Sequence, residues 1–248
     1  MFITDFDGVL CDSVQECLLV TYNAYHRLHA ASSPRSLNLE EIDRATREQF
    51  RKLRSYLRGV EDFIPIFSAI AEQLPITNQK EFDALRSSHQ DHLLTYQQAF
   101  YAERDYLLHH EKGLWLSLNP LFDGIREALR QCASFEQIQI LTTKRQEDVL
   151  EIFQYQGIPF PTDHVTYIKA AGKSQKLLEL LQTNNAALPE SVYVEDQVDF
   201  LIEAQKHRIG SYLVEWGYVS DEQKALARRH AIPIIGVEKF SNLLERFQ

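Results

Sequence analysis

The sequence has few cysteines and no long apolar run. Its three cysteines, Cys11, Cys17 and Cys132, show no CxxC spacing, which argues against a disulfide framework and fits ordinary buried thiols in a reducing compartment. No stretch of eighteen apolar residues occurs, and the first seven residues carry two acids and no basic segment. Neither a membrane span nor a signal peptide is therefore expected, and we predict a cytoplasmic protein.

An excess of positive charge is also lacking. The 248 residues include 26 Lys and Arg against 35 Asp and Glu, which gives a formal net charge of -9. No global basic field would attract nucleic acid or an anionic membrane, so we expect neither as a partner. A small phosphorylated substrate could still bind at a local basic site, and the sequence leaves a monomer and a homodimer equally open.

Several common catalytic motifs are absent. The chain contains no GxxxxGK[ST] phosphate loop, no GxGxxG and no HExxH. His89 and His92 are three residues apart, but no partner of metal-ligand spacing accompanies them. The chemistry is therefore expected at carboxylates.

The order of apolar segments indicates an inserted domain. Met1-Phe2-Ile3-Thr4 reads as a buried strand that ends at Asp5, whereas the next central strand, Ile138–Thr142, comes some 130 residues later. That gap is far longer than one crossover helix. We predict an all-helical cap over residues 14–115, with hinges near Asp12–Gln15 and Trp115–Asn119. Its expected helices are Val14–Leu28, Leu39–Arg58, Asp62–Gln73 and a long one from Asn78 to about Gly113.

The rest of the chain alternates strands and helices. Such alternation predicts an α/β fold, a doubly wound, parallel, Rossmann-like sheet formed by residues 1–13 and 116–248. The expected strands are Ile138–Thr142, Val165–Ile168, Val192–Val194, Tyr212–Glu215 and Ile232–Ile235. The expected helices between them include Gln146–Gln156, Ser174–Leu181 and Asp199–Lys206.

Two acids follow the first strand. Because ligands bind beyond the carboxyl ends of parallel strands, Asp5 and Asp7 can face one site. One carboxylate could attack phosphorus while the other protonates the leaving group and then deprotonates water. The structural alternative is an Asx-rich turn.

Hydroxyls and a lysine follow later strands. Thr142 and Thr143 end a strand before a helix, where they could bind a phosphoryl oxygen or merely cap the helix. Lys173 stands at a helix start and could offset the repulsion between an ionised aspartate and a phosphoryl group. Lys176 is a competitor for this role.

A cluster of acids follows Val192-Tyr193-Val194. Glu195, Asp196 and Asp199 supply the carboxylate oxygens that Mg²⁺ prefers, although acids at a helix start are also ordinary partners of the helix dipole.

Taken together, these elements resemble the haloacid dehalogenase superfamily. The segment ITDFDGVLCDS, from Ile3 to Ser13, is similar to its first motif, and the helical insert is similar to the C1 cap of its phosphoglycolate phosphatase-like branch. The resemblance implies that Asp5 is the nucleophile and that Asp7 marks phosphate transfer rather than dehalogenation. It also implies that Mg²⁺ is held by Asp5, the Asp7 carbonyl and Asp196.

The remaining site residues follow the same resemblance. It implies that Thr142 and Lys173 bind the phosphate, and we expect Gly8 and Thr143 beside it. The sequence departs from the family pattern at Glu195, where Gly is common, and at Asp199, which comes one residue early. Which of these two acids supports the metal is left open.

We therefore expect a Mg²⁺-dependent phosphatase that acts on a small phosphorylated metabolite through an aspartyl-phosphate intermediate. A phosphosugar mutase could use the same acids, and a catalytically silent binding module is a third hypothesis.

A series of arginines marks the expected cap. Arg44, Arg47, Arg51, Arg54 and Arg58 recur at spacings of three and four, so they share one face if a single helix carries them. This face could be merely solvated. The alternative is that one or two arginines, with Arg51 and Arg54 as candidates, bind an acidic group on the leaving side of the substrate.

Overall fold

The computed structural model describes residues 1–248 as two compact units. The first unit, the core, consists of Met1–Asp12 and Pro120–Gln248. The second, the cap, is the continuous segment Ser13–Asn119. No helix in either unit combines the length and apolarity needed to cross a membrane.

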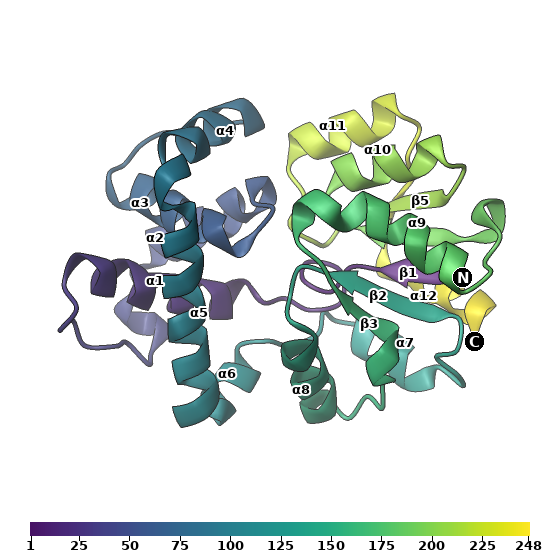
Figure 1. Ribbon diagram of the computed structural model, residues 1–248, viewed down its shortest axis with the longest axis horizontal. Coiled ribbons are helices and arrows are strands. Elements are labelled where there is room, and N and C mark those ends of the chain that lie inside the picture. Colours follow the sequence, from purple (N-terminus) through teal and green to yellow (C-terminus); the bar gives the residue numbers. More distant parts are fainter. The chain divides into compact units, whose positions relative to one another are not determined.

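The core is built on a parallel sheet of six strands in the order β3-β2-β1-β4-β5-β6. The strands are β1 (Phe2–Thr4), β2 (Ile138–Thr142), β3 (Val165–Tyr167), β4 (Val192–Glu195), β5 (Gly210–Val214) and β6 (Ile234–Ile235). The short strand β1 lies in the middle, because Phe2 pairs with Ile138 of β2 and with Val192 of β4. The predicted α/β class and parallel sheet are confirmed (Figure 1).

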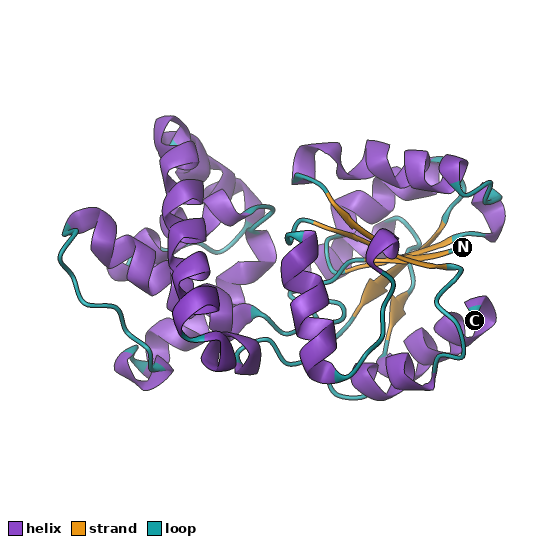
Figure 2. Cartoon of the chain, turned by 60° about the horizontal axis from the view of Figure 1, so that its bottom comes forward, coloured by secondary structure: helices purple, strands orange, loops and turns teal.

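Helices cover both faces of this sheet (Figure 2). They are α7 (Ile125–Gln131), α8 (Gln146–Gln156), α9 (Lys173–Thr183), α10 (Val198–Lys206), α11 (Asp221–Arg229) and α12 (Val237–Leu244). Short 3₁₀ turns lie at Thr162–His164, Ala170–Gly172, Leu188–Glu190 and Glu245–Phe247. Neighbouring strand residues point to opposite faces: Ile3 joins an apolar cluster with Leu177 and Leu201, whereas Phe2 packs edge-on against Phe240 at 5.5 Å.

The cap is entirely helical. Its elements are α1 (Val14–His29), α2 (Arg44–Leu53), α3 (Phe63–Ala71), α4 (Gln79–Ser88), α5 (Leu93–His110) and α6 (Lys112–Ser117), with 3₁₀ turns η1 (Leu39–Glu41), η2 (Arg54–Tyr56), η3 (Val60–Asp62) and η4 (Gln90–His92). Aromatic rings join three of these helices, since Phe63 stacks against Phe50 at 5.8 Å and against Phe100 at 5.0 Å.

A buried ion pair ties the first and fifth helices of the cap together. Arg104 donates hydrogen bonds of 2.8 Å to each carboxylate oxygen of Glu16, and both side chains are almost fully buried. The indole N–H of Trp115 donates to the same carboxylate at 3.1 Å. These three donors satisfy a charge that burial would otherwise disfavour.

Two helix predictions in the cap are wrong. The single helix expected over Leu39–Arg58 is divided, because Ile42 is extended and the carboxylate of Asp43 accepts a hydrogen bond from the N–H of Thr46, which starts a new helix at Arg44.

The long helix expected from Asn78 to Gly113 is also divided, into α4, η4 and α5. Ser87 and Ser88 donate to carbonyls of their own helix at 2.7 Å, which competes with regular helix bonding just before the break. Asn78 does cap α4 as predicted, since its side chain accepts from the N–H of Glu81 at 3.0 Å.

Candidate active site

The carboxyl ends of β1, β2 and β4 bring the main candidates together. Asp5 follows β1, Thr142 ends β2 and Glu195 ends β4, and these strands are parallel neighbours. The N–H of Asp5 donates to the carbonyl of Val194 at 3.1 Å, which continues the sheet register to the first catalytic candidate. Polar side chains after these strands therefore share one edge of the sheet.

Asp5 is buried, with one oxygen paired and one without a partner. Its Oδ2 lies 3.0 Å from Nζ of Lys173, whereas its buried Oδ1 has no hydrogen-bond partner. Burial raises the pKa of Asp5 to about 7; Lys173 opposes this change, and the negative charges of Glu195 and Asp7 add to it. The unpaired oxygen is what a carboxylate would present to an electrophile or a cation.

Lys173 is the lysine of the site. It is buried at the start of α9, and its Nζ lies 2.5 Å from Oε1 of Glu195 as well as beside Asp5. Burial by itself lowers the pKa of Lys173, but the two carboxylates more than offset this, so the pKa is raised. Lys176 instead pairs with Glu179 at 3.4 Å on the surface. Of the two candidate lysines, Lys173 is therefore the one that lies beside Asp5.

Glu195 is surrounded by donors. Its Oε1 accepts from Lys173 and from the hydroxyl of Tyr193 at 3.1 Å, and its Oε2 accepts from the backbone N–H groups of Asp196 at 2.8 Å and Gln197 at 3.0 Å. These four donors fix the carboxylate at the end of β4. Its evident structural task is to hold the ammonium group of Lys173.

Three acids form the candidate metal centre. Carboxylate oxygens of Asp5, Glu195 and Asp196 lie within 4.8 Å of one another, and all three residues are buried. The unpaired Oδ1 of Asp5 in this cluster fits a cation such as Mg²⁺, which takes oxygen ligands. Asp199 is not in the cluster and is exposed in the first turn of α10. Between the two open candidates, Glu195 alone lies with the acids.

Gly8 allows the backbone to approach Asp196 closely. Its φ is +86°, and a Cβ there would overlap the Asp196 carboxylate and lie 2.9 Å from Cδ2 of Tyr218. Gly217 also allows a close approach. A Cβ at this position would overlap the Gly8 carbonyl and lie 2.9 Å from Cβ of Asp196. Only glycine fits at both positions. Gly217 was not among the predicted site residues, although a glycine shortly after a core strand is a signal of such a close approach.

Lys144 is a buried cation that the sequence reasoning missed. Its Nζ lies 3.3 Å from Oδ1 of Asp7, and its side chain is fully buried. Its N–H donates to Oγ1 of Thr142 at 3.1 Å, while Thr143 between them is half-buried. A lysine two positions after Thr142, at a strand end, was the signal. Lys144 thus links the second acid to the end of β2.

Solved structures share the fold of this chain but little of its sequence. No protein-family model and no curated protein sequence matches the chain. Over the whole chain it is similar to a haloacid dehalogenase-like hydrolase of Streptococcus pneumoniae, with 17% identity, 97% of that chain covered and a TM-score of 0.62. It is also similar to a predicted phosphatase of Clostridium acetobutylicum, with 16% identity and a TM-score of 0.57. That match covers 97% of this chain and 95% of the other.

A third similar structure is a predicted phosphoglycolate phosphatase of Haemophilus somnus, with 12% identity and a TM-score of 0.59. The match covers all of this chain and 97% of the other. The chain has the haloacid dehalogenase-like fold. The resemblance read from the first motif is thereby confirmed for the fold.

Within this haloacid dehalogenase-like fold, the cap arginines do not share one face. Arg44, Arg47 and Arg51 lie on α2, but Arg54 lies in η2, with its guanidinium 5.2 Å from the ring centroid of Phe63. Arg58 follows η2 and donates to backbone carbonyls at its own turn. The prediction of one continuous basic face is wrong for the last two, because α2 ends at Leu53.

Proposed function

We propose that this protein is a Mg²⁺-dependent phosphatase that hydrolyses small phosphate monoesters through an aspartyl-phosphate on Asp5. The observation that carries the proposal is the state of Asp5, a buried carboxylate with Oδ2 held by Lys173 and Oδ1 without a partner. The similar solved structures include proteins described as predicted phosphatases.

Asp5 is the nucleophile in this proposal. An oxygen of its carboxylate forms a bond to phosphorus as the bond to the leaving oxygen breaks, and Asp7 gives that oxygen its proton. Asp7 then takes a proton from water, whose oxygen attacks phosphorus while the bond to Asp5 breaks, releasing phosphate. Lys173 keeps positive charge beside both the carboxylate and the phosphoryl group.

Other side chains of the core orient the reacting groups. Oγ1 of Thr142 accepts from the N–H of Lys144, so its own proton can be donated to a phosphoryl oxygen. The ammonium group of Lys144 holds one oxygen of Asp7 in place. Thr143 and the backbone at Gly8 complete the proposed phosphate cradle.

Mg²⁺ would be held by the carboxylates of Asp5 and Asp196 together with the backbone carbonyl of Asp7. When bound, it supplies positive charge that offsets the negative charge of the phosphate and of the nearby acids. Glu195, whose oxygens already accept from four donors, would position Lys173 rather than bind the ion directly.

The proposal is tested by measuring phosphate released from p-nitrophenyl phosphate and a panel of phosphorylated metabolites, with Mg²⁺ and with EDTA. We expect Asp5→Asn to abolish turnover, because it removes the nucleophile and preserves volume. Asp7→Asn should slow turnover by about 10²- to 10⁴-fold, the usual range for a general acid–base group. Substantial turnover by Asp5→Asn, or full activity in EDTA, would reject the mechanism. Transfer of phosphate between substrate positions with little release would identify a mutase instead.

A further inference from the structure

The segment that follows β5, Trp216-Gly217-Tyr218, reaches across the edge of the core sheet. β4 lies between β5 and β1, so a chain that leaves β5 must pass the end of β4 to meet the turn after β1. The segment does meet that turn. The indole N–H of Trp216 donates to the carbonyl of Val9 at 3.0 Å, and the hydroxyl of Tyr218 donates to Oδ1 of Asp12 at 2.9 Å.

The same segment holds an acid of the candidate metal centre. The backbone N–H of Tyr218 donates to Oδ2 of Asp196 at 3.2 Å, and only 3% and 2% of the surfaces of these two residues are exposed. Gly217 packs its backbone against the carbonyl of Gly8 and against Asp196, where a side chain would not fit. Asp196 is therefore held by a segment that supplies none of the proposed metal ligands.

Two of the proposed Mg²⁺ ligands belong to the two parts that this segment joins. Asp196 follows β4, whereas the carbonyl of Asp7 belongs to the turn after β1. That turn is closed by the N–H of Gly8, which donates to the carbonyl of Cys11 at 2.9 Å. Most of the chain separates the two ligands in sequence, so their spacing depends on contacts such as those of Trp216–Tyr218.

We propose that Trp216 and Tyr218 are positioning residues that fix the spacing of the metal ligands and thereby select Mg²⁺ over the larger Ca²⁺. The inference rests on the proposed Mg²⁺ site and adds what determines its selectivity. Mg²⁺ requires oxygen ligands near ideal octahedral positions at about 2.0–2.1 Å, whereas Ca²⁺ accepts about 2.3–2.6 Å and irregular geometry. Close packing at Gly8 and Gly217 draws the two ligand-bearing parts together. If the clamp is loosened they can separate, which Ca²⁺ tolerates and Mg²⁺ does not.

The test measures the binding of Mg²⁺ and of Ca²⁺ to the metal-free protein by calorimetry. Tyr218→Phe removes only the hydroxyl that donates to Asp12. Trp216→Phe removes the indole N–H and keeps an aromatic ring, which in the wild type lies 5.8 Å from that of Phe240. We expect each variant to weaken Mg²⁺ binding by about tenfold, the lower end of the range for groups that orient metal ligands. Ca²⁺ binding should weaken by no more than about twofold.

Changes at Asp12 test the hydrogen bond itself. Asp12→Asn keeps an oxygen that can accept from Tyr218, so its Mg²⁺ affinity should stay near that of the wild type. Asp12→Ala removes the acceptor and should weaken Mg²⁺ binding as much as Tyr218→Phe does. Combining Asp12→Ala with Tyr218→Phe should cost no more than either change alone. Losses that add would mean that the two residues act separately, and would overturn the proposal.

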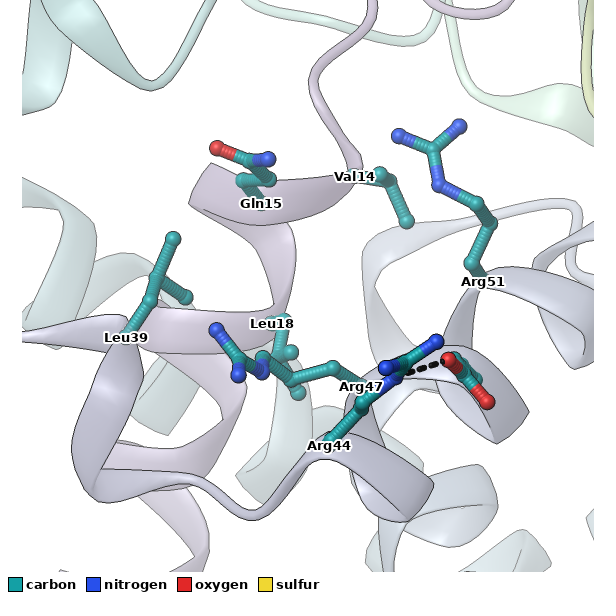
Figure 3. A pocket seen from close by; sticks show the side chains of 8 residues that line it. Val14, Gln15, Leu18, Leu39, Arg44, Arg47 and Arg51 are labelled. Atoms are coloured by element: carbon teal, nitrogen blue, oxygen red, sulfur yellow. Dashed lines mark hydrogen bonds and ion pairs between the residues drawn. The ribbon is translucent and has the colours of Figure 1, made fainter.

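Two control variants should leave both affinities unchanged. Tyr212→Phe removes the hydroxyl of a half-buried tyrosine within β5 itself. Arg47→Gln tests for cation binding at surface acids. Arg47 lines a pocket of the cap (Figure 3), and its guanidinium pairs with the exposed carboxylate of Glu40 at 2.5 Å. If either control changes the ratio of the Ca²⁺ and Mg²⁺ Kd values as much as Tyr218→Phe, the proposal is overturned.

Urea unfolding in EDTA separates positioning from a merely structural role. A Tyr218→Phe variant that loses stability but keeps the ratio of the two Kd values would overturn the proposal, and so would equal weakening for both ions. A wild type that does not prefer Mg²⁺ to Ca²⁺ would also overturn it. The phosphatase proposal is tested separately, because release of phosphate plays no part in these titrations. A protein with the expected Mg²⁺ selectivity that hydrolyses no phosphate ester would reject the phosphatase and leave the clamp standing.

Discussion

Asp5→Asn should stabilise the metal-free protein at pH 8 while it abolishes activity. Asp5 has a pKa of about 7 in the fold against an ordinary value of 3.8, because burial disfavours its charge. In the unfolded chain the carboxyl ionises near its ordinary value. Above pH 7 the folded protein must therefore carry a buried charge that the unfolded chain carries in water.

The direction of the pH effect follows from which state loses its proton first. Between pH 3.8 and about 7 the unfolded carboxyl is ionised while the folded one still holds its proton, so each rise in pH in this window favours unfolding. Below pH 3.8 the ionisation of Asp5 costs the folded state no free energy, and above about pH 7 this cost no longer changes with pH. The difference between the two pKa values corresponds to a cost on the order of 4 kcal/mol, since one pH unit is ~1.4 kcal/mol.

An asparagine at position 5 keeps the shape and never carries the charge. We expect its gain in unfolding free energy to be ~1 to ~4 kcal/mol at pH 8, with the lower figure applying if the new amide finds no acceptor. The gain should shrink at pH 5. Lys173 keeps Glu195 as its counter-charge in the variant, so it is not left unpaired.

The assay is urea unfolding in EDTA at pH 5 and pH 8, for the wild type and for Asp5→Asn. Asp199→Asn is the control, because Asp199 is an exposed acid of the same region. Added Mg²⁺ should narrow the difference at pH 8, since it would bind the wild type more tightly. A variant less stable than the wild type at pH 8 without metal, or a gain of equal size at pH 5, would refute this reasoning.

Three further changes test other parts of the structure. Lys173→Ala should lower kcat by about 10²- to 10³-fold, whereas Lys176→Ala should leave it near the wild-type value, and steady-state kinetics of both variants measures the contrast. Arg104→Met should destabilise the cap by ~3 to ~5 kcal/mol in urea unfolding because it leaves Glu16 buried and unpaired, and a second change, Glu16→Gln, should restore part of the loss. Gly8→Ala should raise the Mg²⁺ concentration needed for half-maximal activity, because its Cβ would displace a metal-site carboxylate; an unchanged requirement would contradict the placement of the turn.

The sequence predicted the core well because its signals are local. The strand Ile138–Thr142 was found with its exact bounds, since a buried apolar run that stops at hydroxyls has few alternative structures. The helix expected over Ser174–Leu181 was also found, although α9 begins one residue earlier, at Lys173. The sequence also showed which polar residue stands at the end of each strand. A parallel sheet then places Asp5, Thr142 and Asp196 at the same edge.

The predictions were weaker where side chains compete with the backbone. The break at Ile42 depends on Asp43 capping a new helix, and an acid at that position is equally common inside a basic helix face. No Gly or Pro stands near Ser88, so nothing in the sequence indicated that the helix ends there. Periodicity alone therefore could not predict where the helices of the cap are interrupted. As a result, Arg54 was predicted to lie on the same helix as Arg51, whereas it lies in η2.

The two residues that the sequence undervalued, Lys144 and Glu195, are both partners of other site residues. Lys144 pairs with Asp7, from which it is separated by the whole cap in the chain, and Glu195 holds Lys173 from a different strand. Such pairings depend on the order of the strands in the sheet. In this sheet β4 lies next to β1, although most of the chain separates the two strands in sequence. No local pattern encodes that neighbourhood.

The charges gathered at this edge of the sheet indicate an order of binding. If all are ionised, the four carboxylates exceed the two ammonium groups by two negative charges, which a divalent cation would balance. These groups belong to Asp5, Asp7, Glu195 and Asp196, and to Lys144 and Lys173. A phosphate ester would add further negative charge to a site that is already negative, and like charges repel one another more strongly at a buried site than in water. We therefore expect Mg²⁺ to bind before the phosphate ester does.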